Sequence, residues 1–121
     1  AVVLGAPLYI GNWLKDAQRF LTQQQAALEK LPVAIFTLSP TRADEDWTEV
    51  RASLDVQLGK YPWLKPVAVE LFGGKYDPAK LKFPATLLTM LPASPLYKAP
   101  ASDARDWDAI HAWVSGLVGK L

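Results

Sequence analysis

Residues 33–41 read Val-Ala-Ile-Phe-Thr-Leu-Ser-Pro-Thr, an apolar run that ends in residues typical of turns. The run lacks the alternation of polar and apolar side chains, which indicates a β-strand covered on both faces. Two other runs, Val2–Leu4 and Val67–Phe72, have the same character. Such strands are typical of parallel sheets between helices, so we expect three parallel strands with Val33–Leu38 in the middle.

Between these runs the apolar residues recur every three or four positions, which is the spacing of an amphipathic helix. The first helix is predicted from Asn12, a good N-cap, to Lys30, because a proline soon follows. A second is predicted from Thr41 to Gly59, and the last begins near Asp106. This order of elements predicts an α/β protein, a three-layer α/β/α sandwich with a parallel sheet.

The 121 residues are interpreted as one domain with an irregular excursion. Residues 73–102 hold five of the ten prolines, yet they are too apolar for a disordered linker, so we predict a packed, Pro-rich flap. The chain opens directly in its first apolar strand. Because an unpaired strand edge invites strand addition, we expect preceding chain or a second copy, as a homodimer, to cover the strand at 1–8.

The composition excludes several classes of function. Thirteen Lys and Arg against 12 Asp and Glu give a formal net charge of +1, which offers no electrostatic case for binding nucleic acid. Zero cysteines and a single histidine, His111, exclude a disulfide framework and a multi-histidine metal site. No apolar run has the length of a transmembrane segment, and the apolar start of the sequence, which has no basic residues before it, is not expected to be a signal peptide. We predict a cytoplasmic location, with no metal site and no catalytic residue.

Ligands of open α/β sheets bind beyond the carboxyl ends of the strands. After the first strand, residues 5–13 contain two glycines and two aromatic residues, Tyr9 and Trp13, that could stack on a planar ring. After the second, Thr37–Thr41 offers hydroxyl and backbone amide groups for the polar edge of such a ring. The same pattern also has a plain structural interpretation, in which the glycines form a turn and both aromatic residues cap the sheet.

Several segments together resemble one known family. They are residues 2–11, Lys15-Asp16-Ala17 with Phe20-Leu21, residues 32–36, Gly73-Gly74 and residues 105–113. In order and spacing they are similar to the flavodoxin-domain family that includes the menaquinone-dependent protoporphyrinogen dehydrogenases. The resemblance implies a flavodoxin-like fold that lacks the first two βα units. It also implies a redox domain that binds flavin mononucleotide (FMN) for electron or hydride transfer with a quinone or another redox partner.

The resemblance further implies which residues flank the flavin ring. They follow the first two strands of the chain: Pro7, Leu8, Tyr9, Ile10, Gly11 and Trp13, then Leu38, Ser39, Pro40 and Thr41. The Ser/Thr-rich loop that holds the FMN phosphate in the family has no counterpart here, so the FMN site is incomplete and the chain alone should bind FMN poorly. The quinone-linked members also carry a basic and aromatic insertion where residues 73–102 are Pro-rich.

An alternative from a different class is a non-enzymatic α/β module for protein interaction or dimerisation, without a cofactor. In this interpretation, Tyr9, Trp13 and the bare strand edge bind a protein partner or a second copy of the chain. A Ser/Thr-rich loop after an additional strand would favour flavin binding, and its absence from the complete protein would favour the interaction module.

Overall fold

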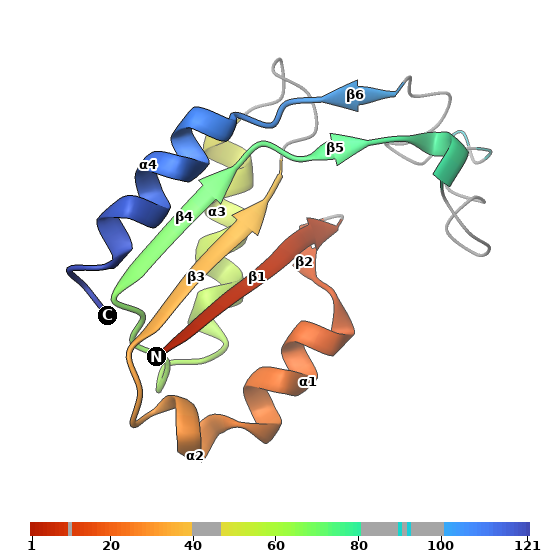
Figure 1. Cartoon of the computed structure of the whole chain (residues 1–121). Helices are drawn as coiled ribbons and strands as arrows, with labels where there is room; N and C mark the ends of the chain where they lie inside the picture. Colours follow the sequence, from red (N-terminus) through yellow and green to blue (C-terminus); the bar gives the residue numbers. More distant parts are fainter. Residues whose placement is uncertain (10, 40–46, 81–89, 91, 93–100) are drawn as a thin grey trace.

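A computed structural model describes residues 1–9, 11–39, 47–80, 90, 92 and 101–121 of the chain (Figure 1). Four strands form one sheet in the order β2-β1-β3-β4. They are β1 (Val2–Tyr9), β2 (Asn12–Trp13), β3 (Val33–Leu38) and β4 (Ala68–Phe72). The strands β1, β3 and β4 are parallel with β3 in the middle, which confirms the prediction. The short strand β2, antiparallel to β1, was not predicted.

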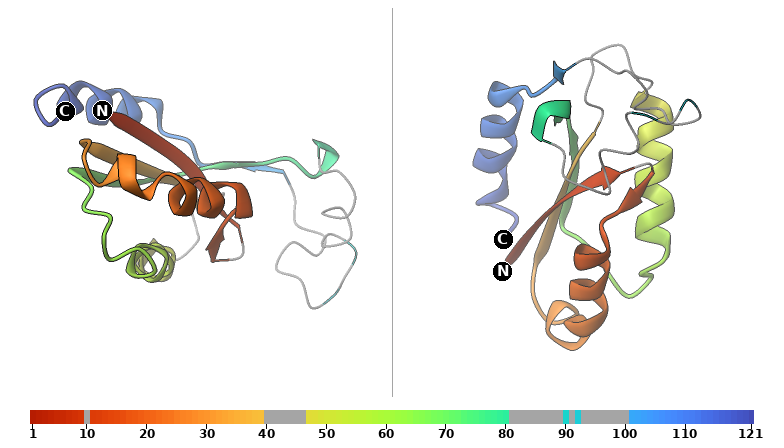
Figure 2. Two further views of the ribbon diagram at one scale, coloured as in Figure 1. Left: turned by 90° about the horizontal axis from the view of Figure 1, so that it is seen from below. Right: turned by 90° about the vertical axis from the view of Figure 1, so that its right-hand side faces the viewer.

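Helices cover both faces of the sheet (Figure 2). They are α1 (Lys15–Gln23), α2 (Gln25–Leu28), α3 (Trp47–Gly59) and α4 (Trp107–Leu117). Alternate residues of β3 belong to different cores: Val33 and Ile35 pack with α1, α2 and α3, whereas Ala34 packs with Leu117 of α4. The α/β/α sandwich is therefore confirmed, and the apolar pattern of β3 reflects cover on both sides.

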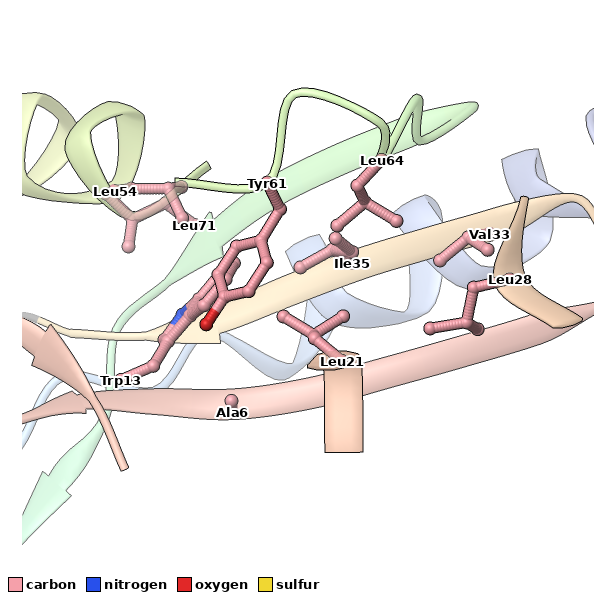
Figure 3. Close-up of a cluster of buried hydrophobic side chains, with 10 residues drawn as sticks. All are labelled: Ala6, Trp13, Leu21, Leu28, Val33, Ile35, Leu54, Tyr61, Leu64 and Leu71. Atoms are coloured by element: carbon pink, nitrogen blue, oxygen red, sulfur yellow. The ribbon is translucent and has the colours of Figure 1, made fainter. Parts of the chain in front are cut away.

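The larger core lies between the sheet and the first three helices (Figure 3). Its buried members are Ala6, Trp13, Leu21, Leu28, Val33, Ile35, Leu54, Tyr61, Leu64 and Leu71. The smaller core lies under α4, where Trp113 contacts Phe36 and Phe72 with ring centroids 5.9 and 5.6 Å away. Edge-to-face contacts of this kind stabilise an aromatic pair in addition to the stability gained from its buried area. The two cores together fix the order of the layers.

The first predicted helix differs most from the structure. Asn12 is not its N-cap but a residue of β2, paired with Tyr9, and α1 begins only at Lys15. The helix also breaks at Gln24, whose backbone has φ −105° and ψ 14°. Gly11, at φ +74°, supplies the left-handed turn that lets the chain reverse after β1. Residues 12 and 13, which were predicted to start the helix, therefore form the second strand of a tight hairpin.

The other helices end and begin close to the predicted residues. The helix α3 ends at Gly59 as predicted, while its predicted start at Thr41 lies outside the described residues. The helix α4 begins after Asp106, whose carboxylate accepts a hydrogen bond from the Ala109 N–H at 3.0 Å. This N-cap agrees with the predicted start of the last helix. Among the described residues, no helix is long and apolar enough to cross a membrane.

Much of the predicted flap at 73–102 lies outside the described residues. Its described part contains β5 (Lys75–Tyr76), β6 (Ser102–Asp103) and the 3-10 turn η1 (Pro78–Lys80). The strands β5 and β6 pair in antiparallel fashion and continue from the end of β4 towards the start of α4. The two ends of the excursion are thus joined as a two-stranded ribbon.

Candidate functional site

The predicted flavin-flanking residues lie where β1 and β3 end. The strand β1 continues to Tyr9, so Pro7 and Leu8 are strand residues rather than loop residues. Pro7 pairs with Leu38 at the end of β3. Three predicted residues, Ile10, Pro40 and Thr41, lie outside the described part of the chain. The remaining residues can be placed face by face.

Strand geometry separates these residues onto the two faces of the sheet, because successive side chains of a strand point in opposite directions. Leu8 and Trp13 are register partners on the face of α1 and α3. Pro7 and Tyr9 take the alternate positions, on the face of α4. Leu38 lies beside Pro7 on that same face. Tyr9 and Trp13 therefore cannot stack on one ring, although the sequence places them close together.

Trp13 lies inside the larger core. Its side chain is 2% exposed, and its ring stacks on Tyr61 with centroids 6.3 Å apart. Its Nε1–H donates a hydrogen bond to the Thr37 Oγ1 at 2.8 Å, and both groups are buried. A buried hydroxyl that is already paired is not offered to a ligand, so this contact fastens the base of the hairpin to the central strand.

An exposed surface remains on the α4 side, formed by Pro7, Tyr9 and Leu38, and we term it the platform. Pro7 is exposed, Tyr9 is 36% exposed and Leu38 is half-buried. Next to it along β1, a Cβ at Gly5 would collide with the ring of Phe36. That ring therefore covers β1 at Gly5, and the platform begins beyond it. The platform offers an aromatic face and two apolar neighbours at the carboxyl ends of two parallel strands.

A glutamine that sequence reasoning missed holds the other end of the hairpin. Gln57 of α3 is 1% exposed, and its Nε2 donates to the Gly11 carbonyl at 3.3 Å and to the Asn12 Oδ1 at 3.2 Å. Its Oε1 accepts from the Lys60 Nζ at 3.4 Å. The signal was present in the sequence, because position 57 lies three residues after Leu54 on the buried side of its helix.

The platform lies in two segments without charged side chains, because none occurs in residues 1–14 or 31–41. The clearest shift in pKa belongs to Asp103, which is lowered from 3.8 to about 2, chiefly by its hydrogen bond from the side chain of Arg105. The same contact raises the pKa of Arg105, whose guanidinium also lies 5.4 Å from the centroid of the Trp107 ring. These residues lie in β6, in the segment that follows it and at the start of α4, so they are separate from the platform in the chain.

One more predicted polar group is already in use. The Ser39 N–H donates to the Phe72 carbonyl at 2.9 Å and joins the end of β3 to β4. Among the described residues, no group of acidic and histidine side chains could hold a metal ion. The platform itself consists of one aromatic and two apolar residues and contains no acidic or histidine side chain.

Comparison with known proteins agrees with this fold. The family model of the flavodoxin domain matches residues 1–92, which include the whole sheet, the platform and Gln57. No curated protein and no solved structure matches the chain. Flavodoxin domains in general bind FMN and serve redox functions. The match spans most of the chain and the mostly parallel sheet flanked by helices is flavodoxin-like, so the chain belongs to the flavodoxin-domain family.

Proposed function

We propose that this domain holds the isoalloxazine ring of a flavin against the platform and serves electron or hydride transfer. The observation that supports this best is the exposure of Tyr9 on the same face as Pro7 and Leu38, at the carboxyl ends of β1 and β3. Ligands of α/β sheets bind at this end. An aromatic pair contributes about 1 kcal/mol beyond its buried area, so Tyr9 is the main contributor to ring binding.

The bound flavin would supply the redox chemistry itself. Tyr9 would stack on one side of the ring, and Pro7 and Leu38 would exclude water from that side. The hairpin formed by β1 and β2 would set the height and tilt of Tyr9. Since residues 2–14 contain no charged side chain, the platform would hold the ring by stacking and apolar contact rather than by ion pairing.

The redox partner we propose is a quinone or another electron acceptor, as in the quinone-linked members that the sequence resembles. The platform is a surface on one side of the sheet, so it would cover one side of the ring and leave the other side open to a flat acceptor. A cytoplasmic location belongs to the same proposal.

Ring binding without a phosphate site makes a specific prediction. Losing about three hydrogen bonds to the phosphate weakens FMN binding by roughly 4 kcal/mol, or about a thousandfold. The chain should therefore bind FMN weakly, and riboflavin, which carries the same ring without phosphate, nearly as well. Titration of each flavin, followed by flavin fluorescence and by the NMR shifts of residues 5–13, measures both affinities.

A matched pair of variants locates the binding. Tyr9→Ala should lower the affinity for FMN about fivefold, because it removes about 1 kcal/mol of stacking. Phe20→Ala is the control, since Phe20 is 38% exposed on α1, which packs on the other face of the sheet from the platform. Equal effects of both substitutions, or no flavin-dependent shift in residues 5–13, would contradict the proposal. Submicromolar binding of FMN but not riboflavin would show that Ser39, Thr41 and the helix that follows hold the phosphate.

We also propose a second function, dimerisation through β1, and a separate observation favours it. The Val2 N–H donates a hydrogen bond to the carbonyl of Pro32, just before β3. Because successive backbone N–H groups of a strand point to opposite sides, those of Val3 and Gly5 point away from β3. No described strand pairs with β1 on that side before Leu8. Because this edge has no charged side chain, a second copy could pair with it without like-charge repulsion. Light scattering over a wide concentration range tests this, and a monomer throughout would contradict it.

A further inference from the structure

We infer that Gln57 is a positioning residue for the flavin site: from α3 it fixes the β1–β2 hairpin and thereby the ring of Tyr9. The inference rests on the proposed flavin function for its consequence and on the contacts of Gln57 for its geometry. Gln57 does not belong to the platform, and its hydrogen bonds join it to Gly11, Asn12 and Lys60. It acts through Gly11 and Asn12, the residues that follow Tyr9 across the turn.

The side-chain amide group of Gln57 uses both of its N–H donors to hold the hairpin. Its Nε2 has two N–H groups, and it donates to two acceptors in the hairpin, the Gly11 carbonyl and the Asn12 Oδ1. Its Oε1 accepts from Lys60, one turn further along the chain. A side chain that is 1% exposed must be paired in this way, because a buried amide without partners is strongly unfavourable.

The position of Gln57 on α3 explains why a polar residue is informative there. Leu54 and Tyr61 occupy the same side of the chain and pack into the larger core. An apolar residue at position 57 would extend that core without any need for partners. Gln57 instead donates its Nε2–H to the carbonyl of Gly11 and to the side chain of Asn12. The polar side chain therefore serves the hairpin rather than the packing of α3.

The hairpin needs such an anchor, because its second strand has only two residues. Short two-stranded hairpins are marginally stable unless they pack against another element. The hydrogen bond from Trp13 to Thr37 fastens the base of the hairpin to β3. The contacts from Gln57 fasten its tip to α3. Because Asn12 is the register partner of Tyr9, holding Asn12 fixes the backbone that carries the Tyr9 ring.

The first test requires no flavin. Gln57→Leu keeps the size and buried character of the side chain and removes its hydrogen bonds, whereas Gln57→Glu keeps the shape and loses the N–H donors. Hydrogen exchange of the amides at 11–13 should become about tenfold faster in both variants, while exchange in β3 stays unchanged. Gln23→Leu, at an exposed position of α1, is the matched control and should change neither. Hairpin protection equal to that of the wild type in Gln57→Leu would overturn the inference.

The second test measures the consequence for the ligand. Gln57→Leu and Gln57→Glu should lower the affinity for FMN about as much as Tyr9→Ala does, and Gln57→Leu combined with Tyr9→Ala should add little further. Asn12→Ala, a change at an exposed residue, provides a variant in case the buried substitutions unfold the chain. If the wild type binds no flavin, the proposed function fails while the exchange result stands. Loosened hairpin amides together with unchanged FMN affinity would overturn the positioning role.

Discussion

The two outer strands of the parallel part of the sheet, β1 and β4, present different edges to solvent. At β4, Glu70 folds back so that its Oε1 accepts a hydrogen bond from the Leu71 N–H at 2.9 Å. The Phe72 carbonyl accepts a hydrogen bond from the Ser39 N–H, so the backbone groups of Phe72 point towards β3. Those of Leu71, the residue before it, therefore point to the outer side of β4. The carboxylate thus occupies a donor that another strand could use, and it adds a negative charge to the edge. The edge at β4 is blocked by its own side chain.

At β1 the corresponding groups have no such protection among the described residues. Val3 is 49% exposed, and the N–H groups of Val3 and Gly5 face the open side. Only the end of the strand is covered, where Leu8 and Tyr9 pair with β2. Natural proteins block strand edges with charges, prolines and short strands, and here Pro7 is the single such device along β1. The contrast indicates that β1, not β4, is the edge suited to receive another strand.

The largest loss of stability is expected at the β1–β2 hairpin, which covers the end of the β1 edge. Trp13→Ala should destabilise the domain by about 3–5 kcal/mol, because it removes a buried aromatic side chain and leaves the Thr37 hydroxyl without its partner. Urea unfolding measures this change. Tyr9→Ala, on the exposed face of the same hairpin, should cost less than about 1 kcal/mol. Similar costs for the two substitutions would show that the hairpin packs differently.

A second prediction compares one glycine near each edge. A Cβ at Gly73, just after β4, would collide with the backbone carbonyl of Ala104, whereas a Cβ at Gly5 of β1 would collide with the ring of Phe36. The backbone at Ala104 is held by a hydrogen bond from the Ala104 N–H to the Gly74 carbonyl at 2.9 Å. The side-chain ring of Phe36 can shift more easily than this backbone. Gly73→Ala should therefore cost about 3 kcal/mol and Gly5→Ala nearer 1 kcal/mol. Thermal unfolding measures both, and the reverse order would mean that the β1 side is the more rigid one.

A third pair of variants exchanges the properties of the two edges. Val3→Lys adds a charge at an exposed position of β1, and it should weaken self-association about tenfold while leaving stability nearly unchanged. Glu70→Val removes the blocking carboxylate, and it should create concentration-dependent association through β4. Sedimentation equilibrium measures both effects. If Glu70→Val and Val3→Lys both associate as the wild type does, with no added association through β4 and no loss at β1, the comparison of the edges is wrong.

The sheet was predictable because its three parallel strands carry a strong and simple signal. Val33–Leu38 is apolar throughout, and this pattern has one physical explanation, cover on both faces. The start of α4 was predictable for a similar reason, because Asp106 is a strong N-cap. In both cases local chemistry and tertiary structure favour the same conformation.

The hairpin was not predictable from the same reasoning, because two local signals compete there. Asn12 is favourable at a helix start, but tertiary contacts with Gln57 and the burial of Trp13 hold it in β2. The faces on which Tyr9 and Trp13 lie depend on the register of β2 against β1, which spacing in the sequence does not give. The predicted residues that the structure describes lie at the ends of β1 and β3 and in the turn after β1, but their division between two faces required the structure, and flavin binding by them stays a prediction.

The smallest expected effect is that of low pH, which should affect the ribbon of β5 and β6 but not β1. The Arg105 side chain donates to Asp103 at 2.9 and 2.7 Å, and this contact lowers the Asp103 pKa to about 2. Since the folded-state pKa is below the ordinary value of 3.8, the contribution of this ion pair is present above about pH 4 and is lost as the pH falls towards 2. Both groups are exposed, so the loss should loosen β6 and the start of α4 without unfolding the sheet. NMR titration of the Asp103 carboxyl, together with hydrogen exchange at 101–106 and at 2–8, measures this. Asp103→Asn should remove the acid dependence of the first segment, and β1, which has no charged side chain, should respond equally in both proteins.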